Sequence, residues 1–230
     1  MLMRQLFDQQ SHTYTYLLAD QQQAVLIDPV RDKLADYLQL LHELALELVM
    51  ALDTHTHADH ITALGALRDQ TGCRTGFGQQ SGSACASFTF TDQQALTFGT
   101  QQLIALHTPG HTDDSYCFYW AGDAQHTGRL FTGDTLLIRG TGRTDFQAGD
   151  AKQQWLSLQR LLQLPGATQV LPGHDYRGWT RSTLAEEQAH NPRLQVADAT
   201  AYAALMSQLK LSNPKLMDIA VPANRACGQQ

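Results

Sequence analysis

The sequence lacks the long apolar and basic segments that direct proteins to membranes or to nucleic acids. None of its 230 residues lies in an apolar run of about 18, the length that a membrane-spanning helix needs. Residues 1–8 contain no apolar signal region, and no Arg-rich transit segment is present, so we expect a cytoplasmic location. The net charge is −6 and no basic run can neutralise phosphates, so we expect no nucleic-acid partner and no membrane partner.

Cysteine is also scarce. The four cysteines are far apart in the sequence, at Cys73, Cys85, Cys117 and Cys227. No two of them have CxxC spacing, which is typical of thiol redox motifs and of zinc-binding modules. Because the cytosol keeps thiols reduced, we expect four reduced thiols rather than disulfides.

The remaining composition is that of a soluble globular protein, with 43% hydrophobic and 17% charged residues. A chain of 230 residues can form one large domain or a core domain with a small appendage. No interdomain linker and no internal repeat of fixed period is visible. We therefore expect a single domain over residues 1–230 with a short C-terminal extension at about 190–230.

Short apolar runs alternate with stretches of helical periodicity, which predicts an α/β protein. Strands are expected at 13–19, 24–27, 48–52, 73–77, 103–107, 115–120, 129–132 and 168–171. Helices are expected at about 32–46, 61–68, 150–162, 183–190 and 201–209. Asp150 is a candidate N-cap, and Thr183 with Glu186 has the spacing of a capping box. The segment 220–228 shows no clear periodicity.

The most informative stretch is Thr54–His60, which reads Thr-His-Thr-His-Ala-Asp-His. It carries three imidazoles and one carboxylate and follows the apolar run Leu48–Leu52, so it lies on a loop between a strand and a helix. Neutral imidazoles and carboxylates at such short spacing are the ligand set of a divalent transition metal. The plain alternative is a polar loop that happens to be rich in His, and the rarity of His disfavours it.

Three further strand ends carry side chains of the same kind. Gly110-His111, Gly133-Asp134 and Gly173-His174 each follow a short apolar run. Strand ends in a layered α/β protein meet along one edge of the sheets, so these side chains can converge with the His-rich loop. Each motif alone would be interpreted as an ordinary loop residue, but together they predict one metal site.

These motifs, in this order, resemble the metallo-β-lactamase superfamily over residues from about 12 to 176. The resemblance implies an α/β fold, the αββα sandwich of metallo-β-lactamase type, with the metal at one edge of two sheets. Further stretches resemble the persulfide dioxygenases (sulfur dioxygenases) within this superfamily. They are Phe-Thr-Gly-Asp-Thr-Leu-Leu-Ile-Arg-Gly at 131–140, Gly-Arg-Thr-Asp-Phe at 142–146, Asn-Pro-Arg-Leu at 191–194 and Ala-Val-Pro-Ala-Asn at 220–224.

The resemblance to the persulfide dioxygenases implies one iron(II) per chain, bound by His55, His111 and Asp134. Two imidazoles and one carboxylate on one face leave three coordination positions open, which is the arrangement of non-haem iron that activates O₂. A structural zinc site would instead be closed by four protein ligands. These three residues are therefore also the predicted catalytic residues.

Four more residues of the motifs fit either of two roles: His57, Asp59, His60 and His174. We interpret them as supporting residues that hold waters and fix imidazole tautomers around the iron. In the binuclear hydrolases of the superfamily, however, the matching residues help to bind two metals. The residue list alone leaves both arrangements open.

The implied substrates are glutathione persulfide and O₂, and the implied products are sulfite and glutathione, as part of sulfide and persulfide catabolism. Glutathione has two carboxylates, so Arg side chains and aromatic or hydroxyl groups near the metal motifs are candidates for binding it. These candidates are Arg143, Tyr176, Trp179 and Arg193. The plain alternatives are surface ion pairs for the arginines and core packing for the aromatics. Cys227 could approach the substrate or be an inert buried thiol.

Two other functions fit parts of the pattern. A hydrolase of glyoxalase II type shares the metal motifs and the glutathione pocket, but it uses two metals to activate water on a thioester. The stretches shared with the dioxygenases and the short C-terminal part weigh against it. A metal-binding scaffold or sensor is disfavoured because no required ligand is missing. A homodimer is expected only from the family resemblance.

Overall fold

The computed structural model describes residues 1–209, 211 and 216–228, and the chain divides into two compact units. The first unit contains Met1–Thr91, Ala95–Gln102 and the described residues from 216 onward. The second unit contains Asp92–Gln94 and the described residues from 103 to 211. A single domain over 1–230 with an extension at about 190–230 therefore stays a prediction.

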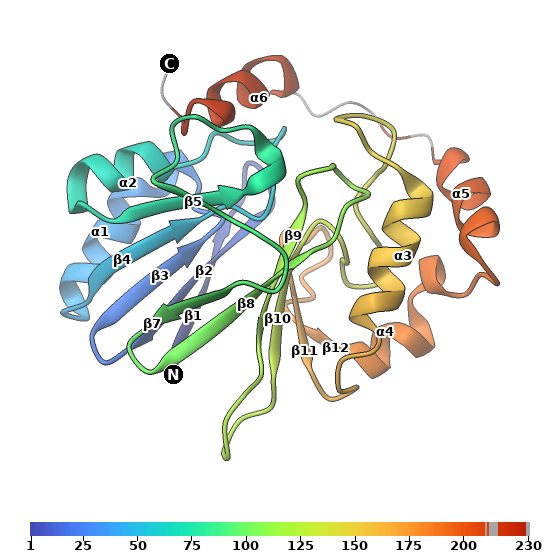
Figure 1. Ribbon diagram of the computed structural model, residues 1–230, viewed down its shortest axis with the longest axis horizontal. Helices are drawn as coiled ribbons and strands as arrows, with labels where there is room; N and C mark the ends of the chain where they lie inside the picture. The colour runs from blue at the N-terminus through green and yellow to red at the C-terminus, as the bar shows by residue number, and fades with distance from the viewer. Residues whose placement is uncertain (210, 212–215, 229–230) are drawn as a thin grey trace. The chain divides into compact units, whose positions relative to one another are not determined.

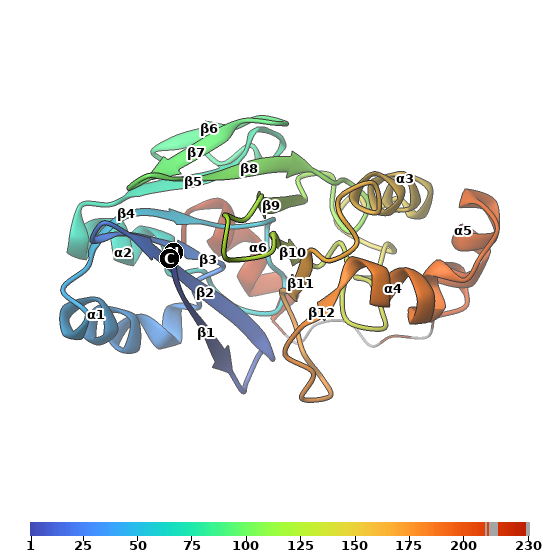
Figure 2. The same cartoon turned by 90° about the horizontal axis from the view of Figure 1, so that it is seen from below.

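The first unit contains a mixed sheet with the strand order β1-β2-β3-β4-β5-β6. Its strands are β1 (Leu2–Asp8), β2 (Thr13–Asp20), β3 (Gln23–Ile27), β4 (Glu47–Leu52), β5 (Arg74–Gly78) and β6 (Phe88–Phe90). The first three strands pair antiparallel, and β3 to β6 pair parallel. Helices α1 (Leu34–Glu43) and α2 (Leu64–Thr71) lie beside this sheet (Figure 1, Figure 2).

Apolar burial on the sheet positions the strand that carries the His-rich loop. Ala51 and Leu52 of β4 are completely buried, as expected for a parallel strand that is covered on both faces. Tyr37 and Leu41 project from α1 into the same cluster as Leu26 of β3. Each fully buried side chain of this size contributes about 1.5–3 kcal/mol to folding. The end of β4, and with it the start of the loop, is therefore anchored in the core.

The other sheet has the strand order β12-β11-β10-β9-β8-β7. Its strands are β7 (Ala95–Phe98), β8 (Gln101–His107), β9 (Tyr116–Trp120), β10 (Arg129–Gly133), β11 (Gln169–Pro172) and β12 (Ser182–Thr183). In the second unit, β8, β9 and β10 pair antiparallel and β10 pairs parallel with β11. The second unit also contains helices α3 (Ala151–Leu161), α4 (Leu184–His190) and α5 (Ala199–Ser207) (Figure 1).

The helices begin largely where capping residues predict. Asp150 accepts hydrogen bonds from the backbone N–H of Lys152 and Gln153 at the start of α3, as expected. Thr183 accepts from the N–H of Glu186 at the start of α4, so the predicted cap is confirmed. No helix in the described part of the chain is long and apolar enough to cross a membrane.

Several elements differ from the sequence predictions. Helix α2 begins at Leu64, three residues after the predicted start, because residues 61–63 continue the loop that follows β4. Strands β1, β6 and β7 were not predicted, since they are short or lack strict alternation of apolar and polar residues. The segment without clear periodicity contains helix α6 (Met217–Arg225), which includes Pro222. A proline inside a helix is unfavourable, so tertiary contacts rather than local propensity hold this helix.

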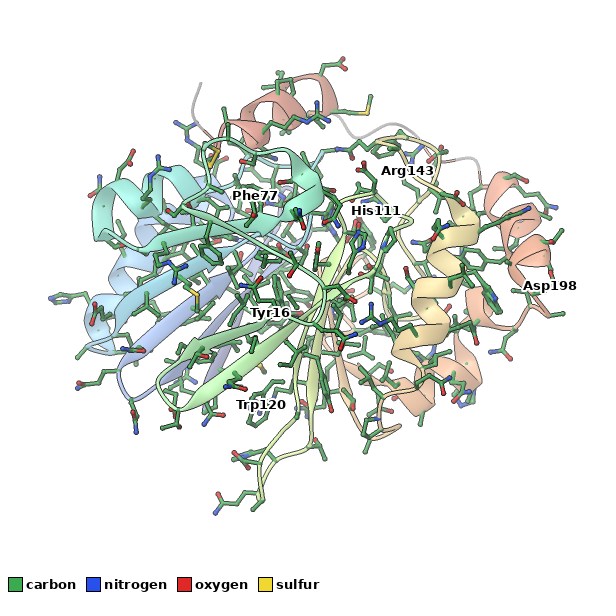
Figure 3. All side chains as sticks on the ribbon, in the orientation of Figure 1. Tyr16, Phe77, His111, Trp120, Arg143 and Asp198 are labelled. Carbon is green, nitrogen blue, oxygen red and sulfur yellow. A yellow bond between two sulfur atoms is a disulfide. The ribbon has the colours of Figure 1, made fainter. Side chains whose placement is uncertain are left out.

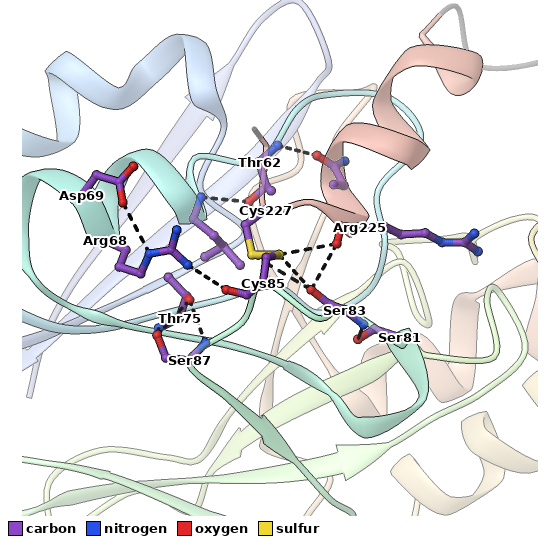
Figure 4. The surroundings of a disulfide bond; sticks show 12 residues. Thr62, Arg68, Asp69, Thr75, Ser81, Ser83, Cys85, Ser87, Arg225 and Cys227 are labelled. Carbon is purple, nitrogen blue, oxygen red and sulfur yellow. Dashed lines mark hydrogen bonds and ion pairs between the residues drawn. A yellow bond between two sulfur atoms is a disulfide. The ribbon is translucent and has the colours of Figure 1, made fainter. Parts of the chain in front are cut away.

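The expectation of four reduced thiols is wrong for two of them. Cys85 and Cys227 form a disulfide (Figure 4), whereas Cys73 and Cys117 are buried thiols that belong to no disulfide. The interpretation of Cys227 as a substrate-facing or inert thiol is corrected accordingly. Because the two cysteines are 142 positions apart, no local spacing pattern could have indicated the bond.

Candidate metal centre

The His-rich loop Thr54–His60 follows β4 in the first unit and is buried although it is polar. Its imidazoles are nearly inaccessible, with exposed fractions of 3% for His55, 1% for His57 and 3% for His60. Buried polar groups are costly unless they are hydrogen-bonded. The fold of this loop therefore depends on partners from elsewhere in the chain.

Asp28, at the end of β3, is the first of these partners. Its Oδ1 accepts from the Thr54 N–H at 2.7 Å, and its Oδ2 accepts from the Thr54 hydroxyl at 3.0 Å. Because that hydroxyl donates its proton to Asp28, it accepts from Nδ1 of His55 at 2.9 Å. This order of bonds leaves Nε2 of His55 with its lone pair, which is the form that binds a metal.

His57 has a different environment from His55. Its Nε2 lies 3.2 Å from Oδ1 of Asp28, and its Nδ1 lies 4.0 Å from Oδ1 of Asp59. Burial by itself lowers the pKa of His57, but the charge of Asp28, the hydrogen bond to it and the charges of Asp53 and Asp59 raise this pKa to about 9. The surrounding carboxylates therefore favour the imidazolium form of His57, which offsets part of the negative charge of this buried acidic cluster.

The end of the loop forms a second hydrogen-bonded group. Nδ1 of His60 lies 2.9 Å from Oδ2 of Asp59, and the hydroxyl of Thr13 donates to the same oxygen at 3.1 Å. His57, Asp59 and His60 each offer a ligand atom, and these atoms lie within 4.8 Å of one another. Asp59 and His60 also line a cavity of about 560 Å³ in the first unit. The first unit thus presents several ligand atoms of its own.

The second unit brings together three residues that the sequence predicted at separate strand ends. Nδ1 of His174 lies 2.6 Å from Oδ1 of Asp134, and Nε2 of His111 lies 3.6 Å from Oδ2 of the same carboxylate. Two atoms that ligate one metal at about 2.1 Å are roughly 3.0–3.6 Å apart at ordinary coordination angles. His111 and Asp134 therefore have the separation that a shared metal requires.

The orientation of His111 is set by the backbone of a neighbouring loop. Its Nδ1 donates to the carbonyl oxygen of Arg143 at 2.7 Å, and Figure 3 shows these two residues close together. Nε2 of His111 consequently carries the lone pair and is directed at Asp134. A Cβ on Gly142 would lie 2.4 Å from the Asp134 carbonyl and 2.8 Å from Nδ1 of His111, so only glycine fits there.

The four candidate substrate-binding residues all lie in the second unit and differ in their surroundings. The guanidinium of Arg143 forms a two-pronged ion pair with Asp145, with N–O distances of 2.6 Å. Arg193 is half-buried and contacts Sδ of Met206 at 3.2 Å. Among the described residues Arg193 has no carboxylate partner within ion-pair distance, so it is better placed than Arg143 to bind a substrate carboxylate.

The two aromatic candidates are largely exposed. Tyr176 is 67% exposed, and its ring stacks on the His174 imidazole with centroids 5.9 Å apart. Trp179 is 46% exposed and lies near the guanidinium groups of Arg139 and Arg177. Core packing, the plain alternative for both residues, does not apply at these exposures. Both rings are accessible to a ligand.

Two supporting residues were missed in the sequence. Asp28 follows an apolar strand, as the predicted ligands do, so the same signal could have found it. Asn224 of α6 donates from Nδ2 to the carbonyl oxygens of His57 and His60 at 2.9 and 2.8 Å. No local pattern marks Asn224, because its partners lie more than 160 positions earlier in the chain.

Comparison with known proteins identifies relatives of the whole chain. A family model described as the metallo-beta-lactamase superfamily matches residues 9–79 and 87–174. Persulfide dioxygenase ETHE1, mitochondrial, of Mus musculus is 43% identical over 100% of this chain and 89% of that protein. The crystal structure of ETHE1 from Myxococcus xanthus matches with a TM-score of 0.95 and 48% identity over 100% of both chains. A probable hydroxyacylglutathione hydrolase of Schizosaccharomyces pombe is 34% identical over 79% of this chain and 69% of that protein.

The chain belongs to the metallo-β-lactamase superfamily, and the predicted αββα fold class is confirmed. Within this superfamily it belongs to the persulfide dioxygenase family, whose members align along its full length. The predicted enzyme class, a persulfide dioxygenase, is thereby confirmed. The hydrolase of Schizosaccharomyces pombe matches less of the chain at lower identity, so it does not displace this assignment.

Proposed function

We propose that this protein uses one iron(II) per chain and O₂ to oxidise glutathione persulfide to sulfite and glutathione. One water completes the balance, since persulfide, O₂ and water give glutathione, sulfite and two protons. The observation that carries the proposal is the full-length match to persulfide dioxygenases in a chain that retains two imidazoles and one carboxylate as ligands. The proposed ligands are His55, His111 and Asp134.

The tautomers of the two histidines support this ligand set. Thr54 accepts from Nδ1 of His55, and the Arg143 carbonyl accepts from Nδ1 of His111, so each imidazole keeps a lone pair on Nε2. Iron(II) held by His55, His111 and Asp134 would supply the redox chemistry with O₂. The chain contributes a fixed ligand geometry and buried surroundings.

The roles of the remaining motif residues follow from their contacts. Nδ1 of His174 donates to Oδ1 of Asp134 at 2.6 Å, so it orients the proposed carboxylate ligand. His57, Asp59 and His60 bond to one another or to Asp28, and we assign them to the support of the loop. Arg193 is the strongest candidate for a glutathione carboxylate, and Tyr176 and Trp179 offer exposed rings beside the His174 loop. Arg143 acts mainly through its backbone carbonyl.

Oxygen uptake by anaerobically iron-loaded protein tests the proposal directly. With glutathione persulfide, we expect O₂ consumption and sulfite release in a one-to-one ratio. Absence of uptake, combined with rapid cleavage of S-lactoylglutathione, would overturn the proposal in favour of a glyoxalase II-type hydrolase. The ligand atoms of His57, Asp59 and His60 are the observation that favours this second candidate. Metal analysis separates the two, because one iron per chain supports the dioxygenase and two metals support the hydrolase.

The cytoplasmic location and the homodimer rest on the sequence alone and stay predictions. The relatives from Mus musculus and Homo sapiens carry the word mitochondrial in their names, which applies to those proteins. Size-exclusion chromatography with light scattering tests the homodimer. A mass corresponding to one chain would contradict it.

A further inference from the structure

The C-terminal segment 217–228, here called the C-terminal hook, contacts the His-rich loop through one buried side chain. Asn224 is completely buried and uses both ends of its amide. Its Nδ2 donates to the carbonyl oxygens of His57 and His60, and its Oδ1 accepts from the Thr62 N–H at 2.8 Å. Three hydrogen bonds from a single side chain thus hold the backbone on both sides of the last loop histidine.

The end of the C-terminal hook contacts residues close to the His-rich loop in sequence and in α2. The backbone N–H of Gly65 in α2 donates to the Cys227 carbonyl at 2.9 Å. A guanidinium N–H of Arg31 donates to the carbonyl of Gly228 at 2.5 Å. Gly228 has a φ of +75°, and a Cβ there would lie 2.1 Å from the Thr62 carbonyl. The close approach and the left-handed backbone both require glycine, so the hook is fitted to the loop.

The disulfide fixes the hook to a second, more exposed loop. Cys85 lies between the 3₁₀ turn η2 (Gln79–Ser81) and β6, and Arg68 of α2 donates to its carbonyl oxygen at 2.7 Å (Figure 4). Cys85 is partly exposed, whereas Cys227 is completely buried. The Ser83 hydroxyl also donates to the Arg225 carbonyl at 3.4 Å. Among these described contacts, the disulfide is the one covalent bond between hook and loop.

We propose that Asn224 is a positioning residue for the metal-binding loop and that the Cys85–Cys227 disulfide holds it in place. The retention of the metal then depends on the redox state of this cysteine pair. The inference rests on the proposed function only in taking His55 as a metal ligand. Because Asn224 holds the carbonyls of His57 and His60, loss of its bonds loosens the loop that carries His55.

The redox step is an ordinary thiol–disulfide exchange with glutathione, the thiol that the proposed reaction releases. A glutathione thiolate attacks Sγ of Cys85, the partly exposed cysteine of the pair, and Cys227 leaves as a thiolate that takes up a proton. A second glutathione thiolate attacks the mixed disulfide and releases Cys85. Two thiols are oxidised to glutathione disulfide, and one protein disulfide is reduced to two thiols.

Substitution of Asn224 tests the positioning role. In Asn224→Ala we expect the Thr62 amide to lose hydrogen-exchange protection and Fe(II) to transfer to a chelator at least tenfold faster than in the wild type. Asn224→Asp keeps an acceptor for the Thr62 N–H but loses both donors, so Fe(II) release is faster while Thr62 stays protected. Unchanged exchange and release in both variants would overturn the proposal.

Asn191→Ala is the matched control for the buried asparagine. Asn191 is equally buried, and its Nδ2 donates to Leu137 O, Gly140 O and Glu187, all in the second unit. This variant should lower the melting temperature by a similar amount without faster amide exchange in residues 57–62. Faster exchange in residues 57–62 would mean that any loss of stability loosens the loop. That result would contradict the positioning role of Asn224.

Reduction of the wild-type protein tests the role of the disulfide, and it does not depend on whether a variant folds. After anaerobic treatment with glutathione, with thiol counting by mass spectrometry, we expect at least threefold faster Fe(II) release and faster exchange at residues 57–62. Cys85→Ser should show both effects without reductant, whereas Cys73→Ser, which alters a free buried thiol, should show neither. Equal release rates in oxidised and reduced protein would overturn the redox part. These readouts do not use O₂ consumption, so their failure can be distinguished from failure of the dioxygenase proposal.

Discussion

The two groups of candidate ligands are supported by different chemical groups. In the first unit the ligand side chains lie on seven consecutive residues, and the side chains of Asp28 and Asn224 hold the loop that carries them. In the second unit the ligands His111 and Asp134 are far apart in sequence, and the backbone of Gly142 and Arg143 packs against them or bonds to them. The contiguous motif is therefore supported by polar side chains, and the dispersed one mainly by a close-fitting backbone loop.

The electrostatics of the two groups differ as well. Asp28, Asp53 and His57 form a buried charged cluster next to the His-rich loop, and the carboxylates raise the pKa of His57. His111 is oriented instead by a neutral carbonyl. Substitutions in the first unit should therefore act mainly through charge, and substitutions in the second unit mainly through packing.

Asp134→Ala should have the largest effect. It removes the carboxylate that lies beside both His111 and His174, so we expect loss of bound iron and at least a thousandfold loss of activity, about 4 kcal/mol. Iron content by atomic absorption and O₂ uptake check this. Asp123→Ala in the exposed β9–β10 hairpin is the control and should retain both. Full iron content in Asp134→Ala would show that the ligand assignment is wrong.

Asp28→Asn tests the charged support in the first unit. The amide keeps the shape of the carboxylate but leaves His57 without its nearest buried counter-charge. Breaking a buried pair by neutralising one partner costs about 3 kcal/mol of folding free energy. Urea denaturation of the metal-free protein measures it. A loss below about 0.5 kcal/mol, the range of ordinary surface substitutions, would contradict the charged cluster.

Gly142→Ala tests the packed support in the second unit. Overpacking of this kind costs about 1–3 kcal/mol, and displacement of His111 should reduce activity at least tenfold. Gly140→Ala is a close control, because a Cβ there meets nothing nearer than Leu137 Cβ at 3.9 Å. If the two variants had equal activity and stability, the tight contact at Gly142 would not position His111.

Arg193→Ala and Arg143→Ala compare two arginines of the same unit. Arg193 has no ion-pair partner in the described chain, so its loss should raise KM for glutathione persulfide about tenfold, or about 1.4 kcal/mol. Arg143 is paired with Asp145, so its side chain should contribute a smaller KM effect. Steady-state kinetics with a constant kcat would support binding roles. A larger effect for Arg143 would reverse the order.

The smallest expected effect is that of pH on the Asp92–Arg160 pair in the second unit. Burial raises the pKa of Asp92, but its hydrogen bonds to Arg160 and to the His107 N–H, with the charge of Arg160, lower it overall. A lowered pKa stabilises the fold above the usual Asp range of about 4, and this contribution disappears as pH falls through the lowered value. Asp92→Asn should cost about 0.5 kcal/mol at pH 7 and progressively less as the pH falls below about 4, measured by urea denaturation. A difference that grew at low pH would contradict this sign.

Much of the fold and the candidate ligands could be predicted because the relevant signals are local. Apolar runs such as 48–52 and 129–132 predicted buried strands, and the Asp150 and Thr183 caps predicted helix starts. The missed elements lack such signals. Helix α6 contains a proline, and the Cys85–Cys227 pair joins positions that no spacing rule connects.

The sequence by itself determined the family, the order of the metal motifs and the types of ligand, because each depends on residue identity over short stretches. Only the tertiary structure decided which nitrogen of each histidine is presented and which arginine is already paired. It also decided that two of the thiols form a disulfide. These properties depend on hydrogen bonds and contacts between residues far apart in the chain, such as Asn224 with the His-rich loop. The spacing of residues in the sequence does not indicate such contacts, because they form only when the chain has folded.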